Sequence, residues 1–355
     1  MGLVHELRKS ERYIDEVEPP MIDVVQNVGL RPRLDKMHLP SAIEERLRKM
    51  LHEEGRNGTG LFLPFDQISA EHGPGHTFVG EGVGDIRNIA KLVESGLFSG
   101  YVLHPGNARL FRHLFPSDVP LIYKIDGHIT QPNPAGIQAT VGSIDEAVKL
   151  GASAVGLTIY PGSEHIRSDL ERAGEIIRRT EEAGLVSVVW AYPRGPGLSQ
   201  ADSLYWTHYA VAIASGLLGA RIIKTKFPAQ VSPENRDAYQ KEIEKVARSN
   251  RSMGAYLCLE PKDKDAQLRL EDHVYRASLV VQAAPGSIVI FSGGPKTKED
   301  PTDDLLNQTR IIMMAGGEGA IYGRNIWGTS VDKGLSISQA VIDVMRRPEF
   351  SRVPY

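Results

Sequence analysis

SIDEAVKLGASAVGLTIY, residues 143–160, contains a complete step from a helix to a strand. Ser143 followed three residues later by Glu146 is the capping-box signature of a helix start, and Gly151 is a residue type that ends helices. The apolar run ASAVGLTIY (152–160) then has the length of a buried strand. A helix that ends directly before a buried strand is typical of the repeating unit of a parallel α/β sheet.

Short apolar runs of this kind alternate with amphipathic stretches from Leu61 onward. Several runs start roughly 33 residues apart, the size of one βα unit, and eight units close into a (β/α)8 TIM barrel. A doubly wound open sheet is the alternative, although eight similar units are unusual for it. The eight runs are LFLPFD (61–66), YVLHP (101–105), PLIYKID (120–126), ASAVGLTIY (152–160), VSVVWAY (186–192), ARIIKTK (220–226), SIVIFSGG (287–294) and GAIYGR (319–324).

Two segments do not fit eight equal units. Residues 1–58 are charged, contain four of the prolines and lack a strand-like run. We predict that they form an N-terminal extension, followed by one TIM-barrel domain over residues 59–355.

The run GAYLCLE (254–260) lies in the long interval between the sixth and seventh strands, where SPEN (232–235) also predicts a helix start. We predict an inserted hairpin or extra strand at 254–260. In the rival interpretation, residues 287–294 do not hold the seventh place in the count of barrel strands.

The overall composition excludes several classes of protein. With 41 basic and 44 acidic residues the net charge is −3, so no global positive charge indicates binding to nucleic acid or to an acidic membrane surface. The single cysteine, Cys258, excludes an intramolecular disulfide and a multi-cysteine metal site, and a buried structural thiol is its expected role. No signal peptide or stretch of about 18 apolar residues is present. We expect a soluble cytoplasmic protein.

Polar side chains collect where the predicted strands end, which in a TIM barrel is where the reacting groups lie. Strand side chains alternate between the two faces, so Lys224 shares a face with Ile222, and Trp190 shares one with Tyr192. We therefore expect a lysine, a phenol and an indole in one cavity. The residues at strand ends are Asp66, Lys124, Tyr160, Trp190, Tyr192, Lys224, Ser292, Gly293, Gly294, Gly323 and Arg324.

Lys224 is the candidate nucleophile because it lies in an apolar strand. Burial there disfavours the ammonium and moves the pKa toward the neutral amine that a Schiff base requires. An ammonium paired with Asp66 or another carboxylate fits the same pattern equally well. Lys226 has the same facing, but we expect it to be wetter and more readily protonated. Lys124 is a third candidate; with Asp126 close by, we expect it to hold a substrate hydroxyl or phosphate.

The segments FSGG and GAIYGRN follow the seventh and eighth strands. Many TIM barrels bind phosphate there through loop amides, and Arg324 could add a bidentate contact. Ordinary tight turns explain these glycines as well. His72 and His76 are four residues apart, but the GPG between them disfavours the helix that a metal pair at this spacing needs. We predict no metal site and no cofactor.

Seven segments together resemble the archaeal and bacterial class I fructose-bisphosphate aldolases, often called the DhnA type. The resemblance spans about residues 60–330, and WAYPRG with the lysine-bearing sixth strand is its most specific part. Members usually read D-H/Q-G-x-E-H after the first strand, whereas Asp66-Gln67 is followed here by Ile68-Ser69-Ala70, which predicts a different loop. The segments are LPFDQ (63–67), EHGPG (71–75), TIYPGSE (158–164), VVWAYPRG (188–195), GARIIKTK (219–226), FSGGP (291–295) and GGEGAIYGR (316–324).

The resemblance implies a role for each matching residue. Lys224 would form the Schiff base, Tyr192 would donate and accept protons, Asp66 would position substrate hydroxyls and assist proton transfer, and Trp190 would shape the site. The implied reaction is the reversible, metal-independent cleavage of fructose 1,6-bisphosphate to dihydroxyacetone phosphate and glyceraldehyde 3-phosphate by a homo-oligomer. The alternatives are a related aldolase or transferase on another phosphorylated ketose, and a non-catalytic barrel that only binds sugar phosphate. The implied phosphate contacts are Arg194, Ser292, Gly293, Gly294, Gly323 and Arg324.

Overall fold

Eight parallel strands form a closed barrel, so the predicted TIM barrel is confirmed and the open sheet is excluded. The computed structural model describes residues 34, 37–52, 56–66, 85–128, 138–247, 256, 259–261, 263, 266–294 and 300–350. All eight predicted apolar runs overlap a barrel strand. In their order around the barrel the strands are β1 (Gly60–Phe65), β2 (Gly100–Leu103), β3 (Leu121–Lys124), β6 (Ala154–Ile159), β7 (Val186–Ala191), β8 (Ile222–Lys226), β9 (Ile288–Ser292) and β10 (Gly319–Ile321).

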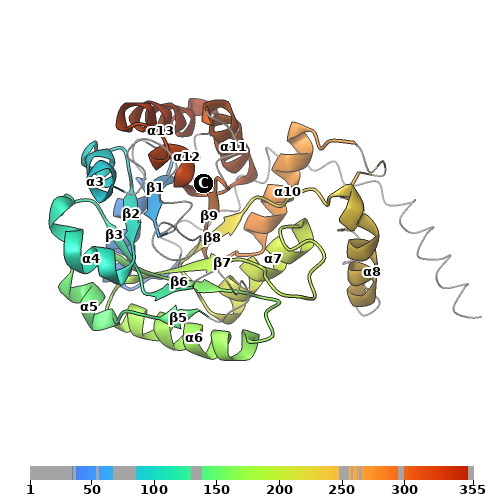
Figure 1. The fold of residues 1–355 in the computed structure, drawn as a ribbon, viewed down its shortest axis with the longest axis horizontal. Coiled ribbons are helices and arrows are strands. Elements are labelled where there is room, and N and C mark those ends of the chain that lie inside the picture. The colour runs from blue at the N-terminus through green and yellow to red at the C-terminus, as the bar shows by residue number, and fades with distance from the viewer. Residues whose placement is uncertain are drawn as a thin grey trace, which may run out of the picture.

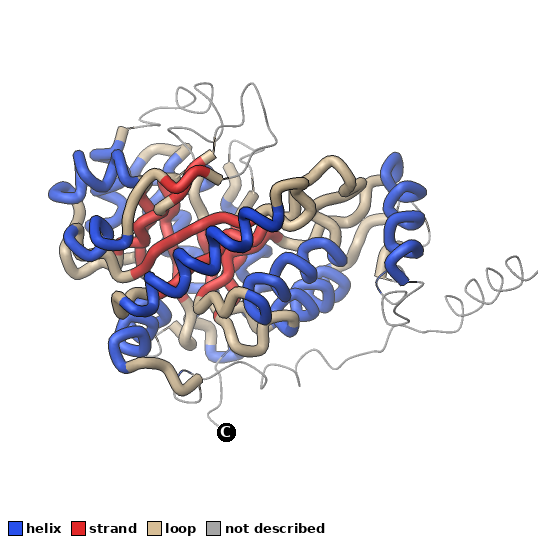
Figure 2. The backbone as a smooth tube through the Cα atoms, turned by 90° about the horizontal axis from the view of Figure 1, so that it is seen from below, coloured by secondary structure: helices blue, strands red, loops and turns tan. Residues whose placement is uncertain are grey.

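Helices surround this barrel, as Figures 1 and 2 show from two directions. Beyond the end of β3, β4 (Asp126–Gly127) and β5 (Ala139–Thr140) form a separate antiparallel pair. In the part of the chain that the structure describes, no helix is long and apolar enough to cross a membrane. The α-helices are α2 (Ser41–Leu51), α3 (Ile86–Glu94), α4 (Pro105–Phe111), α5 (Ile144–Lys149), α6 (Ile166–Glu182), α7 (Leu204–Ala212), α8 (Arg236–Ala247), α10 (Leu270–Gln282), α11 (Thr302–Ala315), α12 (Arg324–Trp327) and α13 (Val331–Met345).

The helix starts and stops follow the local chemistry of the sequence. Ser143 caps α5, and its hydroxyl accepts a hydrogen bond of 3.2 Å from the backbone N–H of Glu146. The Glu146 carboxylate accepts hydrogen bonds from Arg109 and Tyr123, so its side chain joins α4 and β3 to α5. After α5, Gly151 has a φ of +70°, a left-handed conformation that favours glycine. Ser232 and Pro233 begin a short 3-10 helix that leads into α8, as predicted.

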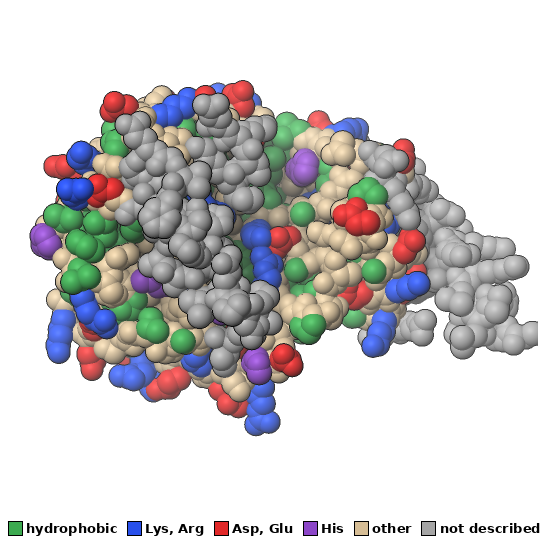
Figure 3. Space-filling view, viewed as in Figure 1, with side chains coloured by type: hydrophobic (Ala, Val, Ile, Leu, Met, Phe, Trp, Pro, Cys, Tyr) green, Lys and Arg blue, Asp and Glu red, His purple; other side chains and the backbone are tan. Residues whose placement is uncertain are grey.

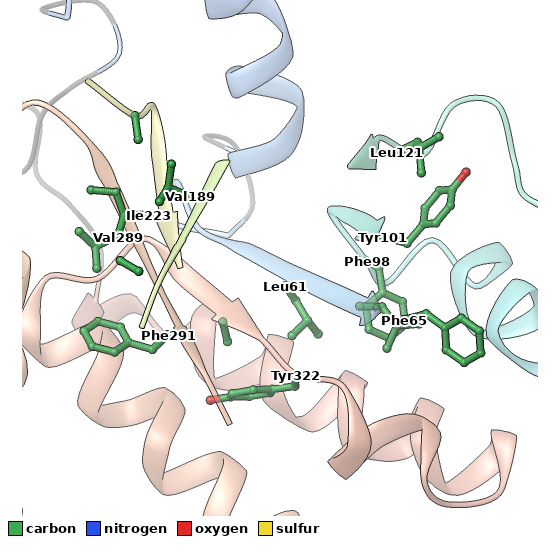
Figure 4. Packing of buried hydrophobic residues seen from close by; sticks show 14 of the residues in the cluster. Leu61, Phe65, Phe98, Tyr101, Leu121, Val189, Ile223, Val289, Phe291 and Tyr322 are labelled. Carbon is green, nitrogen blue, oxygen red and sulfur yellow. The ribbon is translucent and has the colours of Figure 1, made fainter. Parts of the chain in front are cut away.

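The barrel strands have an outer face that is apolar. Their inner face is apolar only toward the N-terminal ends of the strands. Val189, Ile223 and Val289 on three neighbouring strands point outward and pack in the cluster under the surrounding helices (Figure 4). The residues on either side of Ile223 therefore point inward, where Ile222 joins a second cluster inside the barrel. This alternation places Lys224 and Lys226 on the inner face of β8.

Helix α2 covers the N-terminal end of the barrel. Its apolar residues Ile43, Leu47 and Met50 are fully buried and belong to the same cluster as the barrel interior. The backbone of Met50 lies so close to Gly60, the first residue of β1, that a Cβ at Gly60 would lie 2.7 Å from the Met50 carbonyl oxygen. Part of the segment that we predicted as an extension therefore completes the hydrophobic core.

The long interval between β8 and β9 holds α8, which lies apart from the barrel in Figure 1, and α10, which returns to it. A small apolar cluster of Val231, Tyr239 and Ile243 with Tyr205 of α7 anchors this insertion. The strand predicted at 254–260 is wrong at its described positions, since Tyr256 is helical and residues 259 and 260 form a turn and a bend. The rival interpretation, in which residues 287–294 lose the seventh place in the strand count, is also wrong, because β9 pairs directly with β8. Cys258 lies outside the described residues.

Candidate active site

Lys224 lies on the inner face of β8, opposite Trp190 of β7 in the strand register. Its side chain is only 2% exposed, and its ammonium nitrogen lies 4.7 Å from the centroid of the Trp190 ring. Tyr192, two residues beyond Trp190, presents its ring 5.9 Å from the same nitrogen. The lysine, the indole and the phenol that the sequence placed on one face therefore lie close together inside the barrel.

Lys124 of β3 contacts the same indole. Its nitrogen lies 5.3 Å from the Trp190 ring centroid, and the side chain is fully buried. Gly156 of β6 makes room for this arrangement, because a Cβ at this position would lie 2.5 Å from Trp190 Cζ3 and 3.2 Å from Lys124 Cδ. The indole N–H is buried without a hydrogen-bond partner among the described residues, so its donor is unused inside the barrel.

A buried ionic network holds Lys124. Its ammonium pairs with the carboxylate of Asp126, and neither side chain is exposed. The second Asp126 oxygen accepts hydrogen bonds from the backbone N–H of Thr158 at 2.8 Å and from Arg172 of α6 at 2.9 Å. Arg172 in turn pairs with Asp169 at 2.6 Å. A buried charge is costly unless it is paired and hydrogen-bonded, and this network provides both while fixing the position of the ammonium.

Asp66 follows β1 and is 1% exposed. Burial opposes ionisation of its carboxyl group, but the charges of Lys224, His104 and Lys124 outweigh this and hold the pKa of Asp66 below its usual range. His104, at the end of β2, has its Nε2 atom 2.7 Å from the backbone oxygen of Asp66. One carboxylate oxygen of Asp66 is buried and has no hydrogen-bond partner among the described residues. An ionised carboxylate with a vacant acceptor therefore faces the lysines.

Three further charged side chains lie near the Tyr192 ring. Lys226 and Arg194 each lie 5.9 Å from its centroid, and Asp202 accepts from both, at 2.7 Å from Lys226 and 2.8 Å from Arg194. Lys226 is partly exposed, as expected, while Lys224 is buried. Burial, Arg194 and Arg324 lower the pKa of Lys226, although Asp202 opposes the shift.

The loop after β9 contains two glycines, Gly293 and Gly294, that a larger residue could not replace without strain. Ser292 ends the strand opposite Lys226. A Cβ at Gly293 would lie 2.8 Å from a ring carbon of Tyr322, and Gly294 has a φ of +69°. Asn325 donates a hydrogen bond of 3.1 Å to the Gly293 carbonyl, which ties this loop to α12.

Gly323 and Arg324 follow β10, but the strand ends at Ile321, earlier than the predicted run 319–324. Gly323 packs against Pro64, where a Cβ would lie 3.0 Å from Pro64 Cγ, and Arg324 begins the short helix α12. The Nε atom of Arg324 is buried without a partner among the residues that the structure describes, and burial lowers the pKa of its guanidinium. Arg324 is thus a second partly buried cation beside Lys226. In Figure 3 basic side chains are visible at the centre of the molecule, next to the grey atoms.

Sequence reasoning missed several charged residues of the site. His104 was detectable, because the run YVLHP places it at the inward-facing end of β2. Asp202, Asp169 and Arg172 carry no such signal, since they come from a loop and a helix and reach the site only in the folded barrel. His72 and His76, with the rest of residues 67–84, lie outside the described residues. Within the described ranges, no group of three or more His, Cys, Asp or Glu residues is placed to hold a metal ion.

Comparisons with known proteins identify relatives of the chain. The class 1 fructose-bisphosphate aldolase of Thermoproteus tenax is 31% identical over 79% of this chain and 87% of its own length. The corresponding enzyme of Halobacterium salinarum is 27% identical over 77% of this chain and 85% of its own.

Solved structures give the same relationship. A crystal structure of an archaeal fructose 1,6-bisphosphate aldolase has a TM-score of 0.64 and 29% identity, over 85% of this chain and 99% of that one. Another archaeal aldolase, with its catalytic lysine covalently bound to the carbinolamine intermediate of the substrate, has a TM-score of 0.64 and 28% identity over 84% of this chain and 99% of that one. The DeoC/LacD family aldolase pattern matches residues 61–329, which covers all eight barrel strands, and the chain therefore belongs to this family of aldolases.

Proposed function

We propose that this chain is a class I fructose-bisphosphate aldolase that reversibly cleaves fructose 1,6-bisphosphate to dihydroxyacetone phosphate and glyceraldehyde 3-phosphate. The observation that carries the proposal is the buried Lys224 on the inner face of β8, beside Trp190 and Tyr192 and near the ionised Asp66. Relatives named as class 1 fructose-bisphosphate aldolases support the choice of substrate.

In this proposal Lys224 passes its proton to Asp66 and attacks the ketose carbonyl carbon as the neutral amine. Asp66 returns the proton as the carbonyl oxygen leaves as water, which gives an iminium. The C4 hydroxyl then passes its proton to the Asp66 carboxylate, the C3–C4 bond breaks, and its electrons pass into the iminium to form an enamine. Glyceraldehyde 3-phosphate leaves. Tyr192 protonates the enamine at C3 and recovers a proton from Asp66, and water hydrolyses the iminium to release dihydroxyacetone phosphate and the free lysine. The iminium performs the work of a Lewis acid, so the reaction needs no metal.

The remaining residues position the substrate. Asp66 has a vacant carboxylate oxygen with which to accept a hydrogen bond from a substrate hydroxyl, and Trp190 has a vacant N–H donor. Lys124, held by its buried ion pair, supplies a fixed positive charge toward a hydroxyl or phosphate. The phosphates would be bound by guanidinium groups and loop amides, a usual arrangement at this end of TIM barrels. The phosphate-binding residues in this proposal are Arg194, Ser292, Gly293, Gly294, Gly323 and Arg324.

Assembly and location complete the proposal. We place the chain in the sugar-phosphate metabolism of the cytoplasm, as a homo-oligomer. The homo-oligomer rests on the family resemblance alone. Light scattering on the purified full chain tests the assembly, and a monomer at micromolar concentration would contradict it.

Borohydride trapping tests the chemistry. Borohydride added with dihydroxyacetone phosphate delivers hydride to the iminium carbon and leaves a stable secondary amine on the lysine. We expect peptide mapping to find this adduct on Lys224, together with triose phosphate release from fructose 1,6-bisphosphate in a coupled assay. An adduct on Lys226 or Lys124 would show that another lysine is the nucleophile. Activity only with another phosphorylated ketose would keep the Schiff base but contradict the proposed substrate.

A further inference from the structure

Asp202 lies at the junction of two loops at the mouth of the barrel. It belongs to the segment between β7 and α7, and its backbone oxygen accepts a hydrogen bond of 2.7 Å from Ala229, in the loop after β8. The next residue, Ser203, forms a parallel bridge with Ala229. The position of Asp202 is therefore set by the backbone of both loops.

The Asp202 carboxylate connects two cations. One oxygen lies 2.7 Å from the Lys226 nitrogen and the other 2.8 Å from an Arg194 nitrogen. The side chains of Asp202, Lys226 and Arg194 are all partly exposed, so the three charged groups lie at the mouth of the barrel. Although burial opposes it, the charges of Lys226 and Arg194 hold the pKa of Asp202 below its usual range, so the bridging group is a carboxylate.

Strand β8 carries two lysines on its inner face. Lys224 and Lys226 are two residues apart and share the inner face, and either amine would attack a ketose carbonyl if it were neutral and within reach. The groups near Lys226 shift its pKa in opposite directions. Burial, Arg194 and Arg324 favour its neutral form, while Asp202 favours the ammonium.

We propose that Asp202 is a positioning residue that keeps Lys226 as an ammonium for binding substrate phosphate, and so restricts Schiff-base formation to Lys224. An ammonium has no lone pair and cannot attack a carbonyl, but it is a good partner for a phosphate oxygen. The inference rests on the proposed function, because it presupposes that Lys224 is the Schiff-base lysine.

The first test is the distribution of the borohydride adduct between the two lysines. Lys224→Met should leave little labelling by dihydroxyacetone phosphate and borohydride, because Lys226 remains an ammonium. Lys224→Met combined with Asp202→Asn should label Lys226 about tenfold more, and the labelling should increase with pH. Equal labelling of Lys226 with and without Asp202 would overturn the inference.

The second test is steady-state kinetics across pH. Asp202→Asn should raise the KM for fructose 1,6-bisphosphate about tenfold, the usual worth of a charged hydrogen bond, and change kcat less. The KM should begin to rise at a lower pH than in the wild type, because Lys226 loses its proton more easily. Asp202→Glu should recover part of the loss. Exposed Asp303 on α11 provides the control, and Asp303→Asn should leave both constants unchanged.

A third variant separates charge from packing. In a Lys226→Arg background the cation stays protonated without a carboxylate partner, so Asp202→Asn should no longer shift the pH dependence of KM. The same shift in both backgrounds would overturn the inference.

The outcomes also separate the two proposals. If the wild type itself is not labelled at Lys224, the proposed function fails. If the wild type is labelled at Lys224 but Asp202→Asn matches it in KM at every pH, only the inference about Asp202 fails.

Discussion

Gly156→Ala is expected to damage catalysis more than folding, because the added methyl group would enter the space of the Trp190 indole. The new Cβ would lie 2.5 Å from Cζ3 and 2.8 Å from Cη2 of that ring, and 3.2 Å from Cδ of Lys124. Carbon atoms pack at about 3.5–4 Å, so the indole would have to move by about 1 Å. Both neighbours are buried, and Lys124 is also held by its ion pair, so the ring must take up most of the shift.

Two magnitudes follow from this displacement. Overpacking of a dense interior costs about 1–3 kcal/mol of unfolding free energy. A misplacement of about 1 Å beside the reacting groups costs about 100-fold in rate, and Trp190 contacts both Lys224 and Lys124. We therefore expect kcat/KM for fructose 1,6-bisphosphate to fall by about 100-fold in a protein that remains folded.

The assay pairs urea unfolding with the coupled triose phosphate assay. Gly174→Ala in α6 is the matched control, because nothing lies within 4 Å of its Cβ position, and alanine should stabilise the helix by about 0.5–1 kcal/mol without loss of activity. Trp190→Phe in the Gly156→Ala background should restore part of the lost stability, since phenylalanine has no second ring. A Gly156→Ala protein with normal kcat/KM would refute the reasoning, as would an activity loss equal to its unfolded fraction.

Three further expectations concern the chemistry and the stability. Activity should survive exhaustive EDTA treatment, because the electrophile is an iminium; a loss that Zn²⁺ restores would contradict the class I mechanism. Tyr192→Phe should reduce turnover by roughly two to four orders of magnitude yet still permit borohydride trapping at Lys224. Near-normal turnover would show that another group is the proton donor. Burial, with smaller effects of Arg56 and Arg346, lowers the pKa of His52 to about 4. Between about pH 6.5 and pH 4 the unfolded chain therefore binds more protons than the folded chain. The free energy of unfolding should fall by about 1–2 kcal/mol over this range, after allowance for the partial exposure of His52. His52→Asn, which tolerates the left-handed φ of 44°, should remove this acid sensitivity in urea unfolding; an unchanged pH profile would exclude His52 as its source.

The barrel strands were predictable because their signals are local. Each run is apolar, of strand length and separated from the next by capped helices. Once a barrel is predicted, the alternation of side chains along β7 and β8 predicts that Lys224, Trp190 and Tyr192 lie on its inner face. The apolar run at 254–260 was misleading for the same reason. Hydrophobicity over seven residues does not by itself distinguish a strand from an apolar segment of another conformation.

The ionic contacts of the site were predictable only in part. Asp126 is two residues from Lys124, so their pairing followed from the sequence. Arg172, by contrast, reaches Asp126 from a helix 46 residues further along the chain. Asp202 meets Lys226 from a loop 24 residues before it. Such pairs depend on which strands become neighbours, and no periodicity within either segment encodes that.

The position of α2 has a consequence for synthesis of the chain. The helix is translated before every strand whose end it covers, and the barrel closes only when Gly319 of β10 pairs with Gly60 of β1. Those two residues are separated by about 260 others, which a ribosome adding roughly 5–20 residues per second needs about 13–50 s to make. Throughout that time Ile43, Leu47 and Met50 have no completed binding site. Nascent chains should therefore engage chaperones through this helix first.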